Sequence, residues 1–208
     1  MANTTFKGTL RSEGGYSSIA TNSTTGAETT QMSVSSAGFA SLDANTMATE
    51  AGTGITGGTG TIYRSSVIRE GGIIKTSILI DLTGLRSTAS GDIIGVNGTS
   101  NVCHIGQITA ARNGTILAGR MTCFEAPACG DPDINVHSAT EGTGVEDGAI
   151  SSLTETLLVN SGDATTGSVV TFTGVPAADE YLYLTLGATT DADYTAGKLL
   201  IELFGYEA

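Results

Sequence analysis

The sequence predicts an all-β protein: an antiparallel β-sandwich of the jelly-roll type with an extended, low-complexity N-terminal arm. The 208-residue chain has 29 Gly and only 14% charged residues, against about 25% in ordinary globular proteins. Helices with charged outer faces are therefore not expected. From residue 61 onward, short strand-like runs with turn signals between them recur, which is typical of sandwiches and barrels.

Apolar residues are concentrated after residue 60. Residues 1–60 contain 7 Leu, Ile, Val or Phe residues, whereas residues 61–208 contain 39. Within residues 21–60, Ser, Thr, Gly and Ala occupy 28 of 40 positions. Such a segment buries too little surface to offset its ordering entropy. We therefore expect residues 1–60 to be an arm that is disordered or lies extended against a partner, and residues 61–208 to form the sandwich.

Two segments carry the strongest strand patterns. The run TIYRSSVIREGGIIKTSILIDL is broken by Gly71-Gly72 and predicts two strands. Its second half places alternate residues on one face: Ile74, Thr76, Ile78, Ile80 and Leu82. In the last strand, GKLLIELFGY, one face carries Leu199, Ile201 and Leu203. The other face carries Lys198, Glu202 and Tyr206.

Other elements follow from shorter signals. In EYLYLTLGA we expect the leucines to face inward and Tyr181 and Tyr183 outward. Asn97-Gly98 and Asn113-Gly114 are type I′ turn signals, and the second predicts that NVCHIGQITAAR pairs with GTILAGRMTCFE. SSLTETLLV, residues 151–159, is the one segment in which we expect a short helix.

Residues 52–57, GTGITG, match the glycine pattern of a dinucleotide-binding loop. That loop needs a buried strand before it and a helix after it. Upstream, SLDANTMATE has no apolar run; downstream, Glu70 has the spacing of a ribose-binding acid but lies in a strand. The motif fails this test of context. We expect a flexible glycine-rich segment that lets the arm turn back into the sandwich.

Cysteine and histidine supply atoms for a zinc site, but none of them has the two-residue spacing of a zinc knuckle: Cys103, His104, Cys123, Cys129 and His137. Cys123 shares an alternating face with Leu117 and Met121, which is typical of a core cysteine. We expect no metal site and free thiols in a reducing cytoplasm.

Asp131-x-Asp133-x-Asn135 imitates the start of a calcium loop. The glycine required at the sixth position is Val136, and the acid required at the twelfth is Gly142. We expect a surface turn, because Asp-Pro and Asn are turn formers; a loosely bound cation stays open here and at TTDADY, residues 189–194.

No pattern indicates an enzyme. The chain has two histidines and lacks a Gly-x-Ser-x-Gly elbow. Neighbouring acids such as Glu146-Asp147 and Asp179-Glu180 point to opposite sides in a strand and are solvated in a loop. We therefore expect no catalytic residues and no cofactor.

Charge is uneven along the chain. Residues 1–120 hold 8 basic and 7 acidic residues, a net of +1; residues 121–208 hold one basic and 14 acidic residues, a net of −13. Such an acidic half disfavours nucleic acid as a partner. The excess acid serves solubility, or else the acidic half faces solvent while the near-neutral half faces a partner. No apolar run is long enough for a membrane span, and MANTTFKGTLRSEGGYSS lacks the apolar region of a signal peptide.

The two ends of the chain carry a resemblance. MANTTFKGTLRSEGGY contains the pattern Thr-Thr-Phe-x-Gly-x-x-Arg-Ser, and the chain closes with DYTAGKLLIELFGYEA. Both stretches resemble small virion proteins of tailed bacteriophages, especially marine and cyanobacterial ones. The matched positions are Thr4, Thr5, Phe6, Gly8, Arg11, Ser12, Tyr194, Thr195, Gly197, Lys198 and Leu199. The resemblance covers only these two ends and does not extend to the middle of the chain, with its three cysteines.

The resemblance implies a capsid decoration, or cement, protein. Such a protein assembles in the bacterial host cytoplasm, forms homotrimers on the outer capsid surface of the virion and binds the major capsid protein. It bridges neighbouring capsid subunits against internal DNA pressure. Position in the arm and charge select Phe6, Lys7 and Arg11 as capsid contacts. An arm of this composition suits strand addition along a neighbour.

Two other functions stay open. A receptor-binding or fibre-tip module of a phage particle would also be β-rich and trimeric, but it favours exposed aromatic residues, and only 5% of this chain is aromatic. A secreted carbohydrate-binding sandwich would use the Asp131/Asp133 loop for calcium; the missing tryptophan and signal peptide weigh against it.

Overall fold

The computed structural model describes residues 16–21, 24, 26, 28–34, 40–42, 49–58 and 60–207. The chain divides into two compact units, Met1–Met47 and Ala48–Ala208. The second unit thus begins ahead of the boundary expected at residue 61.

The first unit contains a small antiparallel sheet in the order β1-β2-β3. Its strands are β1 (Tyr16–Thr21), β2 (Glu28–Val34) and β3 (Ala40–Leu42). A register shift between Ser18 and Ile19 interrupts the pairing of β1 with β2. No sequence pattern predicts that this unit forms a sheet by itself, but its many Thr residues favour strands.

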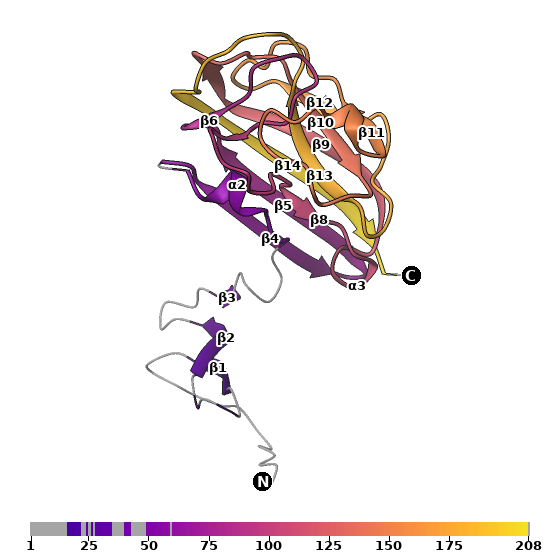
Figure 1. Ribbon diagram of the computed structural model, residues 1–208. Helices are drawn as coiled ribbons and strands as arrows, with labels where there is room; N and C mark the ends of the chain where they lie inside the picture. Colours follow the sequence, from indigo (N-terminus) through magenta and orange to yellow (C-terminus); the bar gives the residue numbers. More distant parts are fainter. Residues whose placement is uncertain are drawn as a thin grey trace, which may run out of the picture. The chain divides into compact units, whose positions relative to one another are not determined.

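Two antiparallel sheets pack around one hydrophobic core in the second unit (Figure 1), which confirms the all-β antiparallel sandwich. The five-stranded sheet, ordered β12-β9-β14-β5-β4, comprises β4 (Tyr63–Glu70), β5 (Ile73–Asp81), β9 (Thr115–Ala128), β12 (Val169–Thr171) and β14 (Ala196–Tyr206). The four-stranded sheet, ordered β11-β10-β13-β8, comprises β8 (Gly106–Gln107), β10 (Ile134–Ala139), β11 (Glu155–Val159) and β13 (Tyr181–Leu186). The remaining elements are β6 (Leu85–Arg86), which pairs with β7 (Gly95–Val96), and the short helices α2 (Thr53–Thr56), α3 (Ala110–Asn113) and η1 (Ile150–Ser152).

The inward residues of β5 and β14 form the middle of the core, as their alternation predicts. All five residues predicted on the apolar face of 74–82 are buried, and so are Leu199, Ile201 and Leu203. The turn between β4 and β5 is Gly71-Gly72, with φ of +58° and +85°. Glycine adopts these left-handed values without strain, so this two-residue turn fixes the register of the hairpin.

Tyr183 is buried, so the prediction that it faces outward is wrong. Its hydroxyl donates to the carbonyl oxygen of Glu141 at 2.8 Å and accepts from the Gly144 N–H at 3.2 Å. The chain after β10 therefore covers the outer side of β13. Because both sides of β13 are covered, its tyrosines and leucines do not sort into polar and apolar faces. Tyr181 is half-buried.

Leu117 is exposed, although it is predicted to share a buried face with Met121 and Cys123. A register shift against β14 falls between Ile116 and Ala118. The extra residue of such a bulge changes the phase of the alternation. Ile116 is therefore buried before the bulge, and Met121 and Cys123 are buried after it.

Asn113-Gly114 ends a helix and does not close the predicted hairpin. The Thr109 hydroxyl caps α3 by accepting from the Arg112 N–H at 3.3 Å, and the Asn113 Oδ1 accepts from the Thr109 N–H at 2.9 Å. Gly114 follows at φ +68°. β8 consequently pairs with β13, while β9 enters the other sheet, so the predicted pairing of these two segments is wrong.

Residues 151–159 do not form the expected helix. Only Ile150–Ser152 make a single 3-10 turn, and Glu155–Val159 form β11. β11 pairs with the edge of β10 and buries Leu158 and Val159. Pairing with β10 outweighs the local helix propensity.

The glycine-rich stretch is packed into the sandwich and is not a flexible hinge. The N–H groups of Gly52 and Gly54 donate to the carbonyl oxygens of His104 and Val102 at 2.8 and 2.9 Å. A Cβ on Gly52 would lie 2.1 Å from the Val102 oxygen. These glycines are therefore required by close approach to a neighbouring segment, and Ile55 after them is fully buried.

Candidate interaction surface

The candidate zinc ligands are not brought together. Cys103 and Cys123 are buried and Cys129 is exposed. Burial raises the pKa of the Cys103 thiol to about 12 and raises the pKa of the Cys123 thiol above its ordinary value. Over residues 49–58 and 60–207 and the described strands of the first unit, no three His, Cys, Asp or Glu side chains form a group that would hold a metal ion.

In the Asp131/Asp133/Asn135 segment, Asp131 and Asn135 use their side chains for hydrogen bonds within the segment and to two distant loops. Asp131 accepts from the Asp133 N–H at 2.8 Å and from the Thr190 hydroxyl at 3.0 Å. Asn135 accepts from the Ser161 N–H at 3.2 Å. The expected surface turn is only partly present: Asp131 is buried, Asp133 forms a β-bridge with Asp163, and Asn135 lies in β10.

Neither histidine forms part of a nucleophilic arrangement. His137 Nδ1 lies 2.7 Å from Glu155 Oε2. His104 packs edge-on against Tyr181 at 4.9 Å between ring centroids, and burial lowers the pKa of its imidazole. Within the part of the chain that the structure describes, no hydrogen bond joins a histidine to a serine, threonine or cysteine side chain. The neighbouring acids lie in turns: Glu180, for example, accepts from the Ala177 N–H at 2.9 Å.

The outward side of the five-stranded sheet is the most distinctive surface of the second unit. It carries the even-numbered residues of β4 and β14 and the odd-numbered residues of β5, because their neighbours in sequence point into the core. Leu117 and Arg120 of β9 also belong to it. We call this side the outer sheet face. It includes large apolar residues at positions where a solvated sheet has polar ones: Ile68, Ile73, Leu79, Leu200 and Phe204.

A cluster of two partly exposed cations around one buried acid lies at the centre of the outer sheet face. Glu202 on β14 is 3% exposed and lies between two cations on the neighbouring strands. Lys75 Nζ lies 2.5 Å from one of its oxygens, and Arg120 Nε lies 2.5 Å from the other. The Arg120 hydrogen bond, followed by contact with Lys75, lowers the pKa of Glu202. The Arg120 guanidinium also lies 5.7 Å from the centroid of the Phe204 ring, within the range of a cation–π contact.

The end of this face nearest the β4–β5 turn is apolar. Ile68 is 49% exposed, Ile73 is 54% exposed and Leu117 at the bulge is 63% exposed. Ile73 pairs across the sheet with Tyr206, and Phe204 pairs with Lys75. A hollow of about 380 Å³ is lined here by Ile68, Glu70, Ile73, Lys75 and Phe204.

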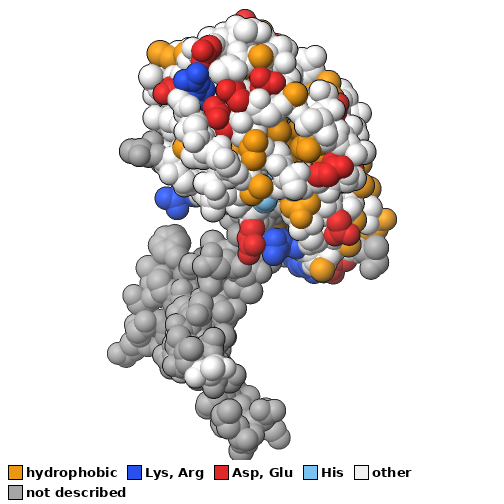
Figure 2. All heavy atoms as spheres, viewed as in Figure 1, with side chains coloured by type: hydrophobic (Ala, Val, Ile, Leu, Met, Phe, Trp, Pro, Cys, Tyr) orange, Lys and Arg blue, Asp and Glu red, His pale blue; other side chains and the backbone are white. Residues whose placement is uncertain are grey.

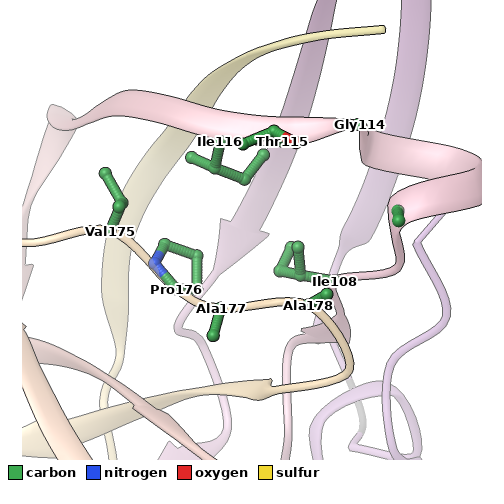
Figure 3. A pocket seen from close by; sticks show the side chains of 9 residues that line it. Ile108, Gly114, Thr115, Ile116, Val175, Pro176, Ala177 and Ala178 are labelled. Atoms are coloured by element: carbon green, nitrogen blue, oxygen red, sulfur yellow. The ribbon is translucent and has the colours of Figure 1, made fainter. Parts of the chain in front are cut away.

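A second hollow, of about 300 Å³, opens where β9 begins. Figure 3 shows Ile116 of β9 and Ile108 facing Pro176 and Val175 of the loop after β12. Its lining contains no ionisable side chain: Ile108, Ala110, Gly114, Thr115, Ile116, Val175, Pro176, Ala177 and Ala178. This hollow offers apolar contact and no acid–base or metal chemistry.

Net charge differs between the five-stranded sheet and the rest of the second unit, where nearly all the acidic residues lie outside the strands. The five-stranded sheet carries five basic and four acidic residues, a net of +1, whereas the rest of residues 49–207 carries two basic and 14 acidic residues, a net of −12. The basic residues of the sheet are Arg64, Arg69, Lys75, Arg120 and Lys198; the acidic ones are Glu70, Asp81, Glu125 and Glu202. On the side of the molecule drawn in Figure 2, acidic side chains are spread over the second unit and basic ones gather at a few places.

The sequence-predicted capsid contacts Phe6, Lys7 and Arg11 lie outside the described residues. The outer sheet face is a site that the alternation analysis missed. Its signal was present in Leu200 and Phe204, which interrupt the polar side of GKLLIELFGY, and in Ile73 and Leu79 on the polar side of β5. Strands with apolar residues on both sides are typical of sheets that are covered on both sides.

No family model, curated protein or solved structure matches this chain. In the described part of the chain, no helix has the length and apolar character needed to cross a bilayer.

Proposed function

We propose that this protein is a structural virion protein that binds the outer surface of a phage capsid and cements neighbouring capsid subunits. The outer sheet face meets the major capsid protein, and the acidic remainder of the second unit faces solvent. The observation that carries this proposal is the charge separation: a near-neutral face with exposed Ile68 and Ile73 belongs to an otherwise acidic domain.

The character of the outer sheet face supports a protein partner. Exposed apolar clusters rimmed by polar groups mark interaction sites, and interfaces combine an apolar centre with a charged rim. Here the apolar part is the hollow beside Ile73 and Phe204, at the end of the face nearest the β4–β5 turn. The Lys75–Glu202–Arg120 cluster, already paired within the chain, forms part of its border. Pre-paired charges lose less on desolvation than free ones.

The resemblance at the chain ends supports the choice of a capsid as the partner. In this proposal the protein acts as a homotrimer, and the N-terminal unit adds further contacts through Phe6, Lys7 and Arg11. No enzyme activity, cofactor or nucleic acid enters the proposal.

Co-sedimentation with purified phage heads that lack this protein tests the proposal. We expect saturable binding to heads and none to intact host cells. Binding to cells alone would replace the proposal with the receptor-binding or fibre-tip alternative. Binding to neither would overturn both.

A pair of matched variants tests the docking face. Ile73→Asp places an acid in the apolar end of the outer sheet face, and Leu157→Asp places one on β11 of the other sheet, where Leu157 is 40% exposed. We expect Ile73→Asp to weaken head binding at least about tenfold, since a desolvated charge costs several times RT, and Leu157→Asp to bind like the wild type. Equal binding by both variants would exclude the outer sheet face.

A further inference from the structure

We propose that β4 is a homotypic interface, at which two copies of this chain join their five-stranded sheets edge to edge about a two-fold axis centred on Val67. The starting observation is that β4 is the last strand of its sheet and pairs only with β5 within the described residues. An eight-residue strand with one open side is a template for another strand.

The main-chain groups that point to the open edge of β4 belong to the residues that a two-fold axis at Val67 would pair. The Asp81 N–H donates to the Ile62 carbonyl oxygen at 2.8 Å, just before β4. Antiparallel pairing alternates, so the even-numbered residues of β4 bond to β5 and the odd-numbered ones direct their N–H and C=O groups to the open edge. None of the described residues hydrogen-bonds to the main chain of Ser65, Val67 or Arg69 on that side. With Val67 opposite its own copy, Ser65 pairs with Arg69 of the second copy, and all three residues find backbone partners.

The charges on β4 are complementary in the same register. Arg64 and Glu70 are both exposed on the outer sheet face, and neither has an ion pair among the residues that the structure describes. They lie three residues before and three residues after Val67, so each Arg64 stands opposite a Glu70 of the second copy. Opposite charges directly across a strand pair attract, and like charges in the same place repel.

The remaining outward positions also fit. Ser66 stands opposite Ile68 of the second copy, and the two Ile68 side chains become diagonal neighbours within reach of each other. The pairing thus covers an exposed isoleucine. A shift of one residue would turn the hydrogen-bonding groups away from each other and separate Arg64 from Glu70.

This contact does not rest on the proposed capsid function, although Ile68 belongs both to it and to the proposed docking face. It also differs from the homotrimer of that proposal, because a two-fold contact closes on two copies. A protein that uses only the β4 contact is a dimer, and one that combines it with a three-fold contact forms an even-numbered assembly.

Charge reversal tests the contact by sedimentation equilibrium of the full chain. Arg64→Glu and Glu70→Arg each place like charges opposite one another. We expect each substitution to raise the dissociation constant of the dimer about tenfold or more above that of the wild type. An equimolar mixture of the two single variants restores both attractive pairs and should form a heterodimer. The double variant Arg64→Glu/Glu70→Arg has the composition of the wild type and should associate like it.

Circular dichroism should show that every variant is folded, because both positions are exposed. A wild-type protein that stays monomeric at high concentration overturns the inference. So does an assembly that the single reversals leave unchanged, or a mixture that does not associate.

Discussion

The Tyr63 hydroxyl lies 2.7 Å from the carbonyl oxygen of Thr49 and 2.7 Å from that of Ile105. Thr49 is fully buried, and its carbonyl oxygen also accepts from the Ser65 hydroxyl at 2.8 Å. This tyrosine therefore joins the start of the second unit, the edge strand β4 and the segment that leads into β8. Burial raises its pKa to about 12, so it stays a donor at all ordinary pH values.

Tyr63→Phe removes that donor from the carbonyl oxygen of Ile105, while the carbonyl oxygen of Thr49 keeps the Ser65 hydroxyl. We expect the free energy of unfolding to fall by about 1–2 kcal/mol, measured by urea denaturation. Tyr206→Phe, at a more exposed tyrosine, is the matched control and should change stability by less than about 0.5 kcal/mol.

Truncation distinguishes the two units. A protein that starts at residue 48 keeps Thr49, Gly52 and Ile55 and should unfold cooperatively. A protein that starts at residue 61 loses the fully buried Ile55, a deletion that costs about 2–5 kcal/mol even for a single large side chain. We expect its thermal midpoint to be lower by about 5 °C or more in calorimetry. Equal midpoints would show that residues 48–60 do not stabilise the sandwich.

Gly52→Ala should destabilise the second unit, because a Cβ would lie 2.1 Å from the Val102 carbonyl oxygen. Displacing that backbone costs about 1–3 kcal/mol. Gly174→Ala is the matched control, since its Cβ would meet only a Leu158 methyl group at 3.7 Å. Chemical denaturation of both variants measures the difference; similar midpoints would contradict the close approach.

Glu202 should make the free energy of unfolding depend on pH in the acidic range. Its pKa is lowered in the folded protein by Arg120 and Lys75, so its contribution is complete above the ordinary glutamate pKa of about 4.3 and is lost as pH falls through the lowered value. Glu202→Gln should cost about 1 kcal/mol at pH 7 and flatten the loss of stability below about pH 4.3. Glu50→Gln, at an exposed position, should leave the pH profile of the wild type intact.

Alternation identifies strands well wherever one side of the strand meets the core and the other meets solvent. The inward sides of β5 and β14 meet the core, and the residues that are buried on those sides are the ones that the alternation predicts. The β4–β5 turn is equally clear, because Gly71-Gly72 supplies the left-handed backbone that a two-residue hairpin requires.

The misplaced elements share a different physical cause: tertiary contacts that local sequence does not contain. Tyr183 is buried because a distant loop covers it, and Leu117 is exposed because a bulge shifts the phase of β9. Gly52 carries a motif-like pattern, yet its role is set by contact with residues 102–104. Apolar residues on the polar sides of β5 and β14 signal the outer sheet face in the sequence, but the order of the strands in the sheet is needed to join them into one surface.

The difference in net charge between the five-stranded sheet and the rest of the second unit also gives that unit a dipole moment. A freely diffusing copy has a net of +1 on one sheet and −12 on the rest of residues 49–207, so a negatively charged particle exerts a torque on it before any contact forms. The torque turns the five-stranded sheet toward the particle and the acidic side away. Its strength falls with added salt, because the Debye length shrinks to about 8 Å at physiological ionic strength. Encounters with an anionic shell are therefore pre-oriented at low salt and random at high salt.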